Sequence, residues 1–262
     1  MLFLLYRHLL VNKAESGLII QFDYTGSINM RLPPLRKTIL SVLFISVSAL
    51  AIVTYSIAQS EKMSFFVTSV GKGDGGNLGG LEGADAHCNS LASEAGSSKN
   101  WAAYLSTSMV VDRSNGRPFK ITNGVSARDR IGEGPWHNAE GVLIANNVDE
   151  LHSADVNINI ETALNEKGDK INGRGTRPNQ HDVLTGSDSV GHFSTAGGDT
   201  TCMNWTSNSS DGSAIVGHHD RVGGNKSRNM VSWNSSHGSL GCGLEDLPKS
   251  GGAGLFYCFA TE

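Results

Sequence analysis

Four cysteines that follow an export-type segment constrain this chain more than any other feature. Cys88, Cys202, Cys242 and Cys258 all lie after an uncharged apolar run at residues 38–58, and no cysteine precedes that run. An even number of cysteines in an exported chain indicates disulfides, here two bonds with three possible connectivities. No CxxC or CxxH pair is present to seed a zinc site. We therefore expect a domain that is stapled by two disulfides.

The apolar run has the arrangement of a signal peptide. Arg31, Arg36 and Lys37 precede it, and it ends in the small-x-small sequence Ser56-Ile57-Ala58, so we expect cleavage before Gln59. An uncleaved anchor is the alternative, because the 21 residues at 38–58 would also span a bilayer.

A natural basic segment begins at Met30, which defines the expected domain organisation. We expect residues 1–29 to be an over-extended N-terminus with Met30 as the true start. Residues 30–58 are then the signal peptide or membrane anchor, and residues 59–262 form a single domain.

The expected domain is acidic. Residues 59–262 carry 16 lysines and arginines against 23 aspartates and glutamates, a net charge of −7. Such a surface disfavours nucleic acids and anionic membranes as partners. We expect a secreted, periplasmic or cell-surface protein that contacts a membrane only if residues 38–58 stay uncleaved.

Short apolar segments separated by glycine-rich loops predict an α+β domain. The chain holds 32 glycines, and the segment at residues 71–80 is a glycine loop. One early helix is expected at residues 83–95, where small apolar residues recur at three- and four-residue steps. Residues 158–178 are polar and are expected to form a long loop outside the core. Short strands are expected at residues 64–70, 101–105, 142–145, 183–184, 214–216 and 255–259.

Several motifs occur in a specific order along the chain. They are Phe66-Val67-Thr68, residues 77–88 ending in GADxxC, Tyr104-Leu105-Ser106, residues 184–188, residues 201–205 with CxxW spacing, and residues 254–259. Together they resemble the C-type-lectin-like fold in its endostatin-like variety, over about residues 65–260. The resemblance implies short antiparallel strands, long loops and the nested disulfides Cys88–Cys258 and Cys202–Cys242. Exported bacterial proteins of this pattern are commonly labelled lectins, a label that rests on fold.

The resemblance does not extend to the calcium site of C-type lectins. Those lectins hold calcium with a Glu-Pro-Asn or Gln-Pro-Asp loop and a Trp-Asn-Asp strand. Here Trp233-Asn234-Ser235 has serine in place of the second carboxylate, and neither proline motif occurs. Calcium takes six to eight oxygen ligands, several of them carboxylates. We predict no cofactor, since the sequence supports neither calcium nor a transition metal.

The densest polar group in the chain lies at residues 217–237. Aromatic rings beside Asn, Asp and His are suited to a sugar, which has an apolar face and hydroxyls. The alternatives are a buried hydrogen-bond network that holds the loops, or a transition-metal site. Trp205 is expected in the core, whereas Trp233 is left open between core and ligand contact. The residues expected to line or support a ligand site are His218, His219, Asp220, Trp233, Asn234 and His237.

The sequence favours a binding module over an enzyme. His181-Asp182 with Ser187 or Ser194 would be compatible with a Ser–His–Asp triad, but no Gly-x-Ser-x-Gly frames a serine. We predict no catalytic residue and expect an exported module that binds a glycan or glycoconjugate without the usual calcium site. The alternatives are an extracellular adhesion or structural module that binds a surface protein, and a metal-dependent hydrolase.

Overall fold

The computed structural model describes residues 12–14, 17–19, 61–118, 120–195 and 198–262. The chain divides into two compact units, Met1–Ile57 and Ala58–Glu262. In the first unit, β1 (Asn12–Ala14) and β2 (Gly17–Ile19) pair antiparallel. The expected signal peptide or anchor and its cleavage site lie outside the described residues. Among the described residues, no helix is long and apolar enough to cross a membrane.

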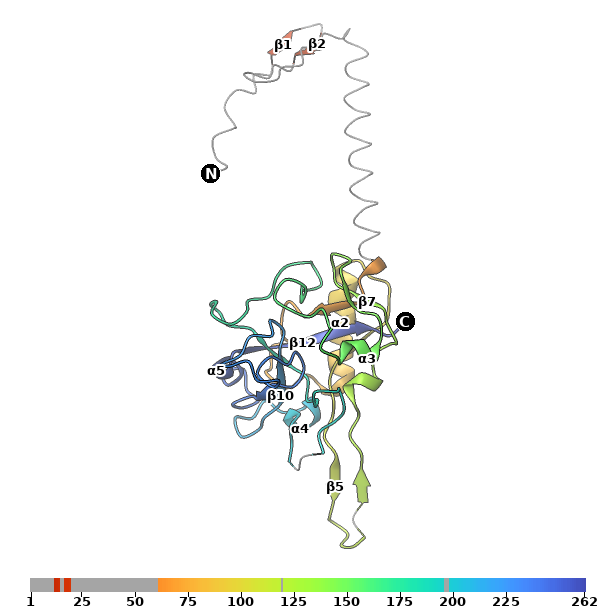
Figure 1. Cartoon of the computed structure of the whole chain (residues 1–262), viewed down its shortest axis with the longest axis vertical. Helices are drawn as coiled ribbons and strands as arrows, with labels where there is room; N and C mark the ends of the chain where they lie inside the picture. Colours follow the sequence, from red (N-terminus) through yellow and green to blue (C-terminus); the bar gives the residue numbers. More distant parts are fainter. Residues whose placement is uncertain (1–11, 15–16, 20–60, 119, 196–197) are drawn as a thin grey trace. The chain divides into compact units, whose positions relative to one another are not determined.

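The second unit is built around one long strand, β12 (Gly252–Ala260) (Figure 1). It pairs antiparallel with β3 (Phe65–Val67) and β4 (Trp101–Ala103), and parallel with β9 (Asp182–Leu184). Beyond β9 the sheet continues antiparallel through β10 (Ile215–His218) and β11 (His237–Gly238). The expected antiparallel pairing is wrong for β9 and β12, because the long connection at residues 185–251 lets the chain re-enter the sheet in the same direction.

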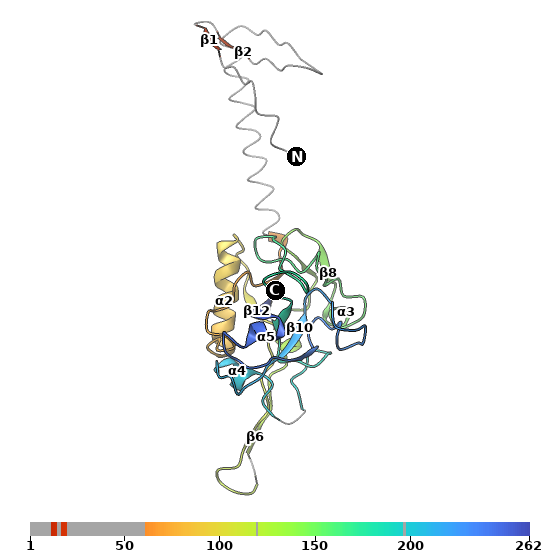
Figure 2. The same cartoon turned by 90° about the vertical axis from the view of Figure 1, so that its left-hand side faces the viewer.

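Both faces of β12 are buried, as its apolar sequence on both sides requires. On one face, the Phe259 ring packs against the rings of Tyr104 and Trp136, with centroids 5.7 and 5.3 Å apart. On the other face, Cys258 is bonded to Cys88 of α2 (Gly80–Glu94). Figure 2 shows α2 along one side of the unit, with β12 beside it. The core therefore sits on both sides of a single central strand.

The helix expected at residues 83–95 is confirmed as α2, and its GADxxC motif fixes it to the sheet. A Cβ on Gly83 would lie 2.1 Å from the carbonyl oxygen of Leu78, so only glycine fits there. Asp85 accepts a hydrogen bond from the backbone N–H of Ala103 at 2.8 Å and pairs with Arg130 at 2.6 Å. Such charge-assisted bonds are stronger than neutral ones. The motif thus holds α2 against β4.

Smaller elements surround this sheet. The strands β5 (Val110–Asp112) and β6 (Lys120–Thr122) pair as a hairpin that projects from the unit, in a stretch where the sequence had no clear pattern (Figures 1 and 2). The remaining described elements are the strand pair β7 (Trp136–His137) and β8 (Leu143–Ala145), the 3-10 helix η1 (Ala127–Asp129), and the short helices α3 (Val148–Leu151), α4 (Cys202–Trp205) and α5 (Leu247–Ser250).

Residues 158–178 do not form the excursion that the sequence predicts. The segment lacks regular helices and strands, but Ile158 and Ala163 are fully buried in the core, and Ile171 is 6% exposed. Glu166 is also buried, and its carboxylate accepts hydrogen bonds from the backbone N–H and the hydroxyl of Ser69. The expectation was wrong because a few scattered apolar side chains anchor an irregular backbone without any periodic pattern.

Two disulfides join the described residues, Cys88–Cys258 and Cys202–Cys242, and no cysteine is free. These are the two pairs that the resemblance implies. The first links α2 to β12 and the second links α4 to the loop after β11. The structure therefore confirms an α+β fold with few helices, short strands and two disulfides.

Candidate functional site

The strands β9, β10 and β11 bring a carboxylate and imidazoles together on one face of the sheet. His218 of β10 lies directly opposite Asp182 of β9, and His237 of β11 lies opposite Val216. Residues two apart on a strand share a face, so His218 is on the same face as Val216 and its partner His237. His181 comes immediately before β9. The ladder register therefore brings Asp182, His218 and His237 together, and His181 joins them from the residue before β9.

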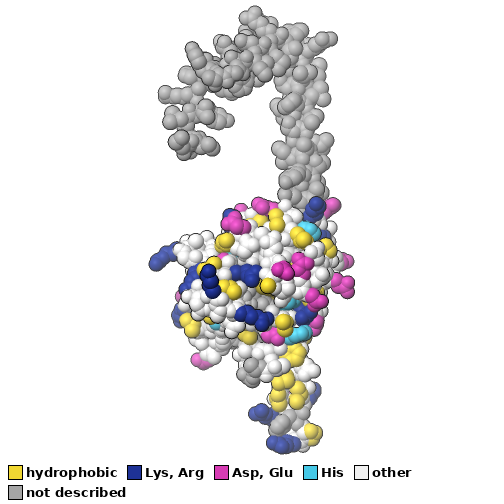
Figure 3. Space-filling view, in the orientation of Figure 1, with side chains coloured by type: hydrophobic (Ala, Val, Ile, Leu, Met, Phe, Trp, Pro, Cys, Tyr) yellow, Lys and Arg dark blue, Asp and Glu magenta, His cyan; other side chains and the backbone are white. Residues whose placement is uncertain are grey.

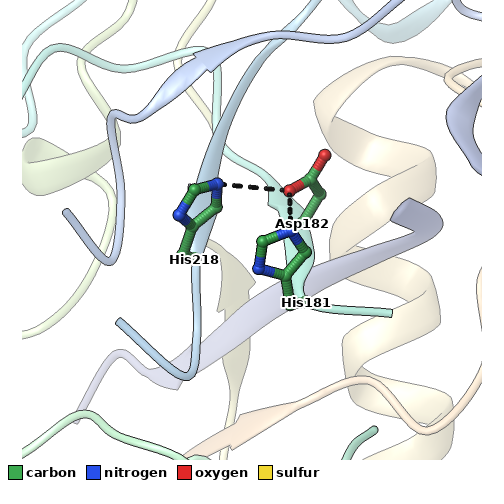
Figure 4. A group of neighbouring side chains, drawn as sticks. All are labelled: His181, Asp182 and His218. Carbon is green, nitrogen blue, oxygen red and sulfur yellow. Dashed lines mark ion pairs between the residues drawn. The ribbon is translucent and has the colours of Figure 1, made fainter. Parts of the chain in front are cut away.

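The Asp182 carboxylate lies at the centre of the cluster. Its Oδ1 is 3.1 Å from Nε2 of His181, 3.4 Å from Nε2 of His218 and 3.6 Å from Nε2 of His237. Figure 4 shows the rings of His181 and His218 directed at this oxygen. The Nε2 atoms of His218 and His237 are 3.0 Å apart. The ligand atoms of His181, Asp182 and His218 thus all lie within 4.8 Å of one another, and His237 adjoins this group through Asp182 and His218.

The cluster is buried on all sides except that of His237. The side chain of Asp182 is 1% exposed, those of His218 and His181 are 1% and 4% exposed, and that of His237 is 30% exposed. Despite the short distances, neither carboxylate oxygen of Asp182 has a hydrogen-bond partner among the described residues. A buried carboxylate without hydrogen bonds is costly.

The outer nitrogens of the three imidazoles face oxygen atoms. Nδ1 of His218 is 2.8 Å from the carbonyl of Met230, and Nδ1 of His237 is 3.1 Å from the carbonyl of Gly238. Nδ1 of His181 is 3.5 Å from Oδ1 of Asp220, too long for a strong hydrogen bond. A carbonyl oxygen can only accept, so we assign the proton of His218 and of His237 to Nδ1. Their Nε2 lone pairs then point into the cluster.

His219 and Asp220 lie beside the cluster without entering it. Burial lowers the pKa of His219 to about 4, so its imidazole is neutral near pH 7, with Nε2 3.4 Å from the carbonyl of Asn172. Burial raises the pKa of Asp220, but His181 and the backbone N–H groups of Arg174 and Val222 outweigh this and lower it to about 2. For Asp220 the structure has the hydrogen-bond network that the sequence offered as an alternative, whereas Nδ1 of His219 is buried without a hydrogen-bond partner among the described residues.

Trp233 and Asn234 are packed inside the unit. Trp233 is 4% exposed, and its indole N–H donates to the carbonyl of Leu151 at 3.1 Å. Asn234 is 1% exposed and donates from Nδ2 to the hydroxyl of Tyr104 at 3.0 Å. Burial favours the core role for Trp233, and it confirms that role for Trp205, which is fully buried. Of the six residues expected at a ligand site, five are buried, a position that suits support rather than contact.

A cleft between β5 and residues 198–204 is a feature that the sequence did not indicate. Its volume is about 440 Å³, and it is lined by Ser108, Met109, Val110, Val111, Arg113, Gly198, Asp199, Met203 and Asn204. Met203 is 64% exposed, and it belongs to a left-handed turn: φ is 49° at Cys202, 57° at Met203, 55° at Asn204 and 66° at Trp205. The sequence does not predict this turn, because its four residues are not glycine and left-handed backbone is normally formed by glycine.

The left-handed turn is held from several sides. The carboxylate of Asp199 accepts hydrogen bonds from the backbone N–H of Thr201 at 3.0 Å and of Met203 at 2.6 Å. Oδ1 of Asn204 accepts one from the backbone N–H of Ser108 at 2.7 Å. The Cys202–Cys242 disulfide anchors its first residue. Left-handed conformation costs about 1–2 kcal/mol for each residue with a Cβ, so these contacts are needed to maintain the turn.

Comparison with protein-family models and with curated proteins gives no match for this chain. The chemistry of the described side chains is thus the guide to function. A triad of His181, Asp182 and Ser187 finds no support in the contacts, because Ser187 is buried and bonds to Ser106 and to the carbonyl of Thr185. The two places with unexplained chemistry are the Asp182 cluster and the cleft beside the left-handed turn.

Proposed function

We propose that the unit Ala58–Glu262 is an exported C-type-lectin-like module that binds a carbohydrate or glycoconjugate without the usual calcium bridge. The fold assignment is supported by the disulfides, because both pairs implied by the motif resemblance are the pairs present. It is further supported by the position of the GADxxC helix, which is bonded through Cys88 to the closing strand β12. The proposed role is binding rather than catalysis.

The strained turn beside the cleft is the observation that carries the ligand-binding proposal. Backbone strain that the surrounding structure maintains is concentrated at ligand clamps and active sites. In this chain, two of the four left-handed residues, Met203 and Asn204, line an open cleft, and the other two are buried beside them. We place the contact with ligand here, because five of the six residues expected from the sequence are buried.

The cleft offers the two kinds of surface that a sugar requires. Met109, Val110 and Met203 supply apolar surface for the C–H face of a sugar ring, and Arg113 and Asn204 supply polar atoms for its hydroxyls. His218, Trp233 and the other buried residues of 217–237 then act by holding the strands and loops of the unit in place.

A glycan array on the full oxidised chain tests this proposal. The array is run once with calcium and once with EDTA, and binding that survives EDTA is the expected result. A Val110→Ser variant should then bind the same glycan more weakly, whereas Val222→Ser, at a similarly exposed valine outside the cleft lining, should bind it as the unchanged chain does. Equal affinity of the two variants would remove the cleft from the proposal, and loss of binding in EDTA would contradict the calcium-free mode.

A protein partner is the second candidate, favoured by the projecting hairpin. Val110 and Ile121 on β5 and β6 are 48% and 59% exposed, and Figure 3 shows hydrophobic side chains along the hairpin with Lys and Arg at its end. Exposed apolar patches mark interaction surfaces. If no glycan on the array is bound either with calcium or with EDTA, a protein partner is favoured over a glycan ligand.

A further inference from the structure

We propose that His181, Asp182, His218 and His237 form a binding site for one divalent transition-metal ion of the zinc class. Imidazole nitrogens together with a carboxylate are suited to zinc, and zinc sites most often have four protein or solvent ligands in tetrahedral arrangement. This site is separate from the cleft: none of its residues lines the cleft, and its existence does not depend on glycan binding.

The distances between the potential ligand atoms agree with coordination of a single ion. Zinc lies about 2.0–2.1 Å from histidine nitrogen and about 2.0–2.2 Å from carboxylate oxygen. Ligand atoms at the corners of such a tetrahedron are about 3.3–3.5 Å apart. Here Asp182 Oδ1 lies 3.1, 3.4 and 3.6 Å from the three Nε2 atoms, and the Nε2 atoms of His218 and His237 are 3.0 Å apart. The ligand atoms of His181, Asp182 and His218 all lie within 4.8 Å of one another, whereas His237 falls outside this group and would have to move closer to His181 to complete the tetrahedron.

The protonation pattern calls for a cation at the centre. Nδ1 of His218 and of His237 faces a backbone carbonyl, so their Nε2 lone pairs face each other and the carboxylate of Asp182. Lone pairs and an anion at these distances repel one another in a buried space. Neither oxygen of Asp182 receives a hydrogen bond from the described residues. A metal ion at the centre satisfies all of these atoms at once.

The surroundings have the features of a metal site. Histidines that bind metals usually direct their other ring nitrogen at a carbonyl or carboxylate, which orients the ring. Met230 and Gly238 provide the carbonyls for His218 and His237, and the Asp220 carboxylate lies 3.5 Å from Nδ1 of His181. The two buried carboxylates, Asp182 and Asp220, together balance the charge of a divalent ion. The half-exposed edge at His237 provides a route of entry from solvent.

Zinc titration of the full oxidised chain, purified without a histidine tag and stripped of metal with a chelator, tests the site. Isothermal titration calorimetry and metal analysis after dialysis should show one zinc per chain. Asp182→Asn removes the central charge with little change of shape, and His237→Gln alters the most exposed ligand. Each variant should bind zinc at least about tenfold more weakly, the loss that removal even of an outer partner of a metal ligand produces.

The matched control is His87→Gln, which alters a half-buried histidine of α2 outside the cluster. This variant should bind zinc as the unchanged chain does. Near-ultraviolet circular dichroism checks that all variants fold, and His237→Gln remains informative if Asp182→Asn does not. The proposal is overturned if the unchanged chain takes up no zinc, as expected when a protonated histidine neutralises Asp182 instead. It is also overturned if His237→Gln binds zinc as tightly as His87→Gln. Neither result bears on glycan binding, which is measured separately.

Discussion

Replacing Met203 by glycine should stabilise the protein, because it relieves backbone strain in the left-handed turn. Met203 has φ 57° and ψ 50°, and its side chain is largely in solvent at 64% exposure. A residue with a Cβ costs about 1–2 kcal/mol in this conformation. Glycine has no such cost but loses more entropy on folding, about 0.5–1 kcal/mol. The difference predicts that Met203→Gly raises the free energy of unfolding by up to about 1.5 kcal/mol.

Urea unfolding of the oxidised chain, followed by tryptophan fluorescence, measures this change. A higher midpoint with an unchanged slope would show a gain in stability rather than a change in the unfolded state. Leu244→Gly is the control: Leu244 is 53% exposed, and its φ is not positive. The control should lower stability by about 0.5–1 kcal/mol, since glycine brings only its entropic cost there. If Met203→Gly loses as much stability as Leu244→Gly, strain in the turn is not the determining factor and our reasoning is refuted.

Two further predictions concern the disulfides and pH. Replacing both cysteines of Cys88–Cys258 by alanine should lower the urea midpoint more than replacing both cysteines of Cys202–Cys242. The sequence separations of 170 and 40 residues correspond to about 5 and 4 kcal/mol of chain entropy, and loss of the second disulfide also lets the strained turn relax. The reverse order of the two midpoints would contradict this prediction. Burial lowers the pKa of His152 below its ordinary value of 6.5. On unfolding, the imidazole becomes exposed and takes up a proton when the pH is below that value. The free energy of unfolding should therefore fall as the pH is lowered from 7 to 5. His152→Gln should fall less steeply over the same range in thermal unfolding, and equal slopes would exclude His152 as a source.

Much of the fold could be predicted because several helices and strands have characteristic patterns of apolar residues within their own sequence. The helix α2 follows from small apolar residues at helical spacing, and β12 follows from a short run of large apolar residues. The disulfide pairs followed only from the motif resemblance, since four cysteines alone allow three connectivities. The parallel pairing of β9 with β12 could not be predicted, because it depends on the path of a long irregular connection. The buried segment at residues 158–178 was missed for a similar reason: its few apolar anchors have no period.

The sites were harder to predict than the fold. The sequence drew attention to His218 and His237, but not to their meeting with Asp182, which depends on the register of three strands. His181 and Asp182 were considered only with a serine. Burial favours the core role for Trp233, which the sequence left open because the same aromatic residue can pack inside a protein or face a ligand. The left-handed turn at Cys202–Trp205 could not be predicted, because it contains no glycine.

The central position of β12 determines when the sheet of the domain can be completed. Every strand that β12 joins directly, β3, β4 and β9, precedes it in the chain, and β12 also carries Cys258, the partner of Cys88. While the chain grows from the ribosome, the sheet lacks its middle strand, and Cys88 of α2 lacks its disulfide partner. The strands β3 and β4 cannot be joined to β9 through the sheet until β12 has been made. The six-stranded sheet is therefore complete only once β12 has been made.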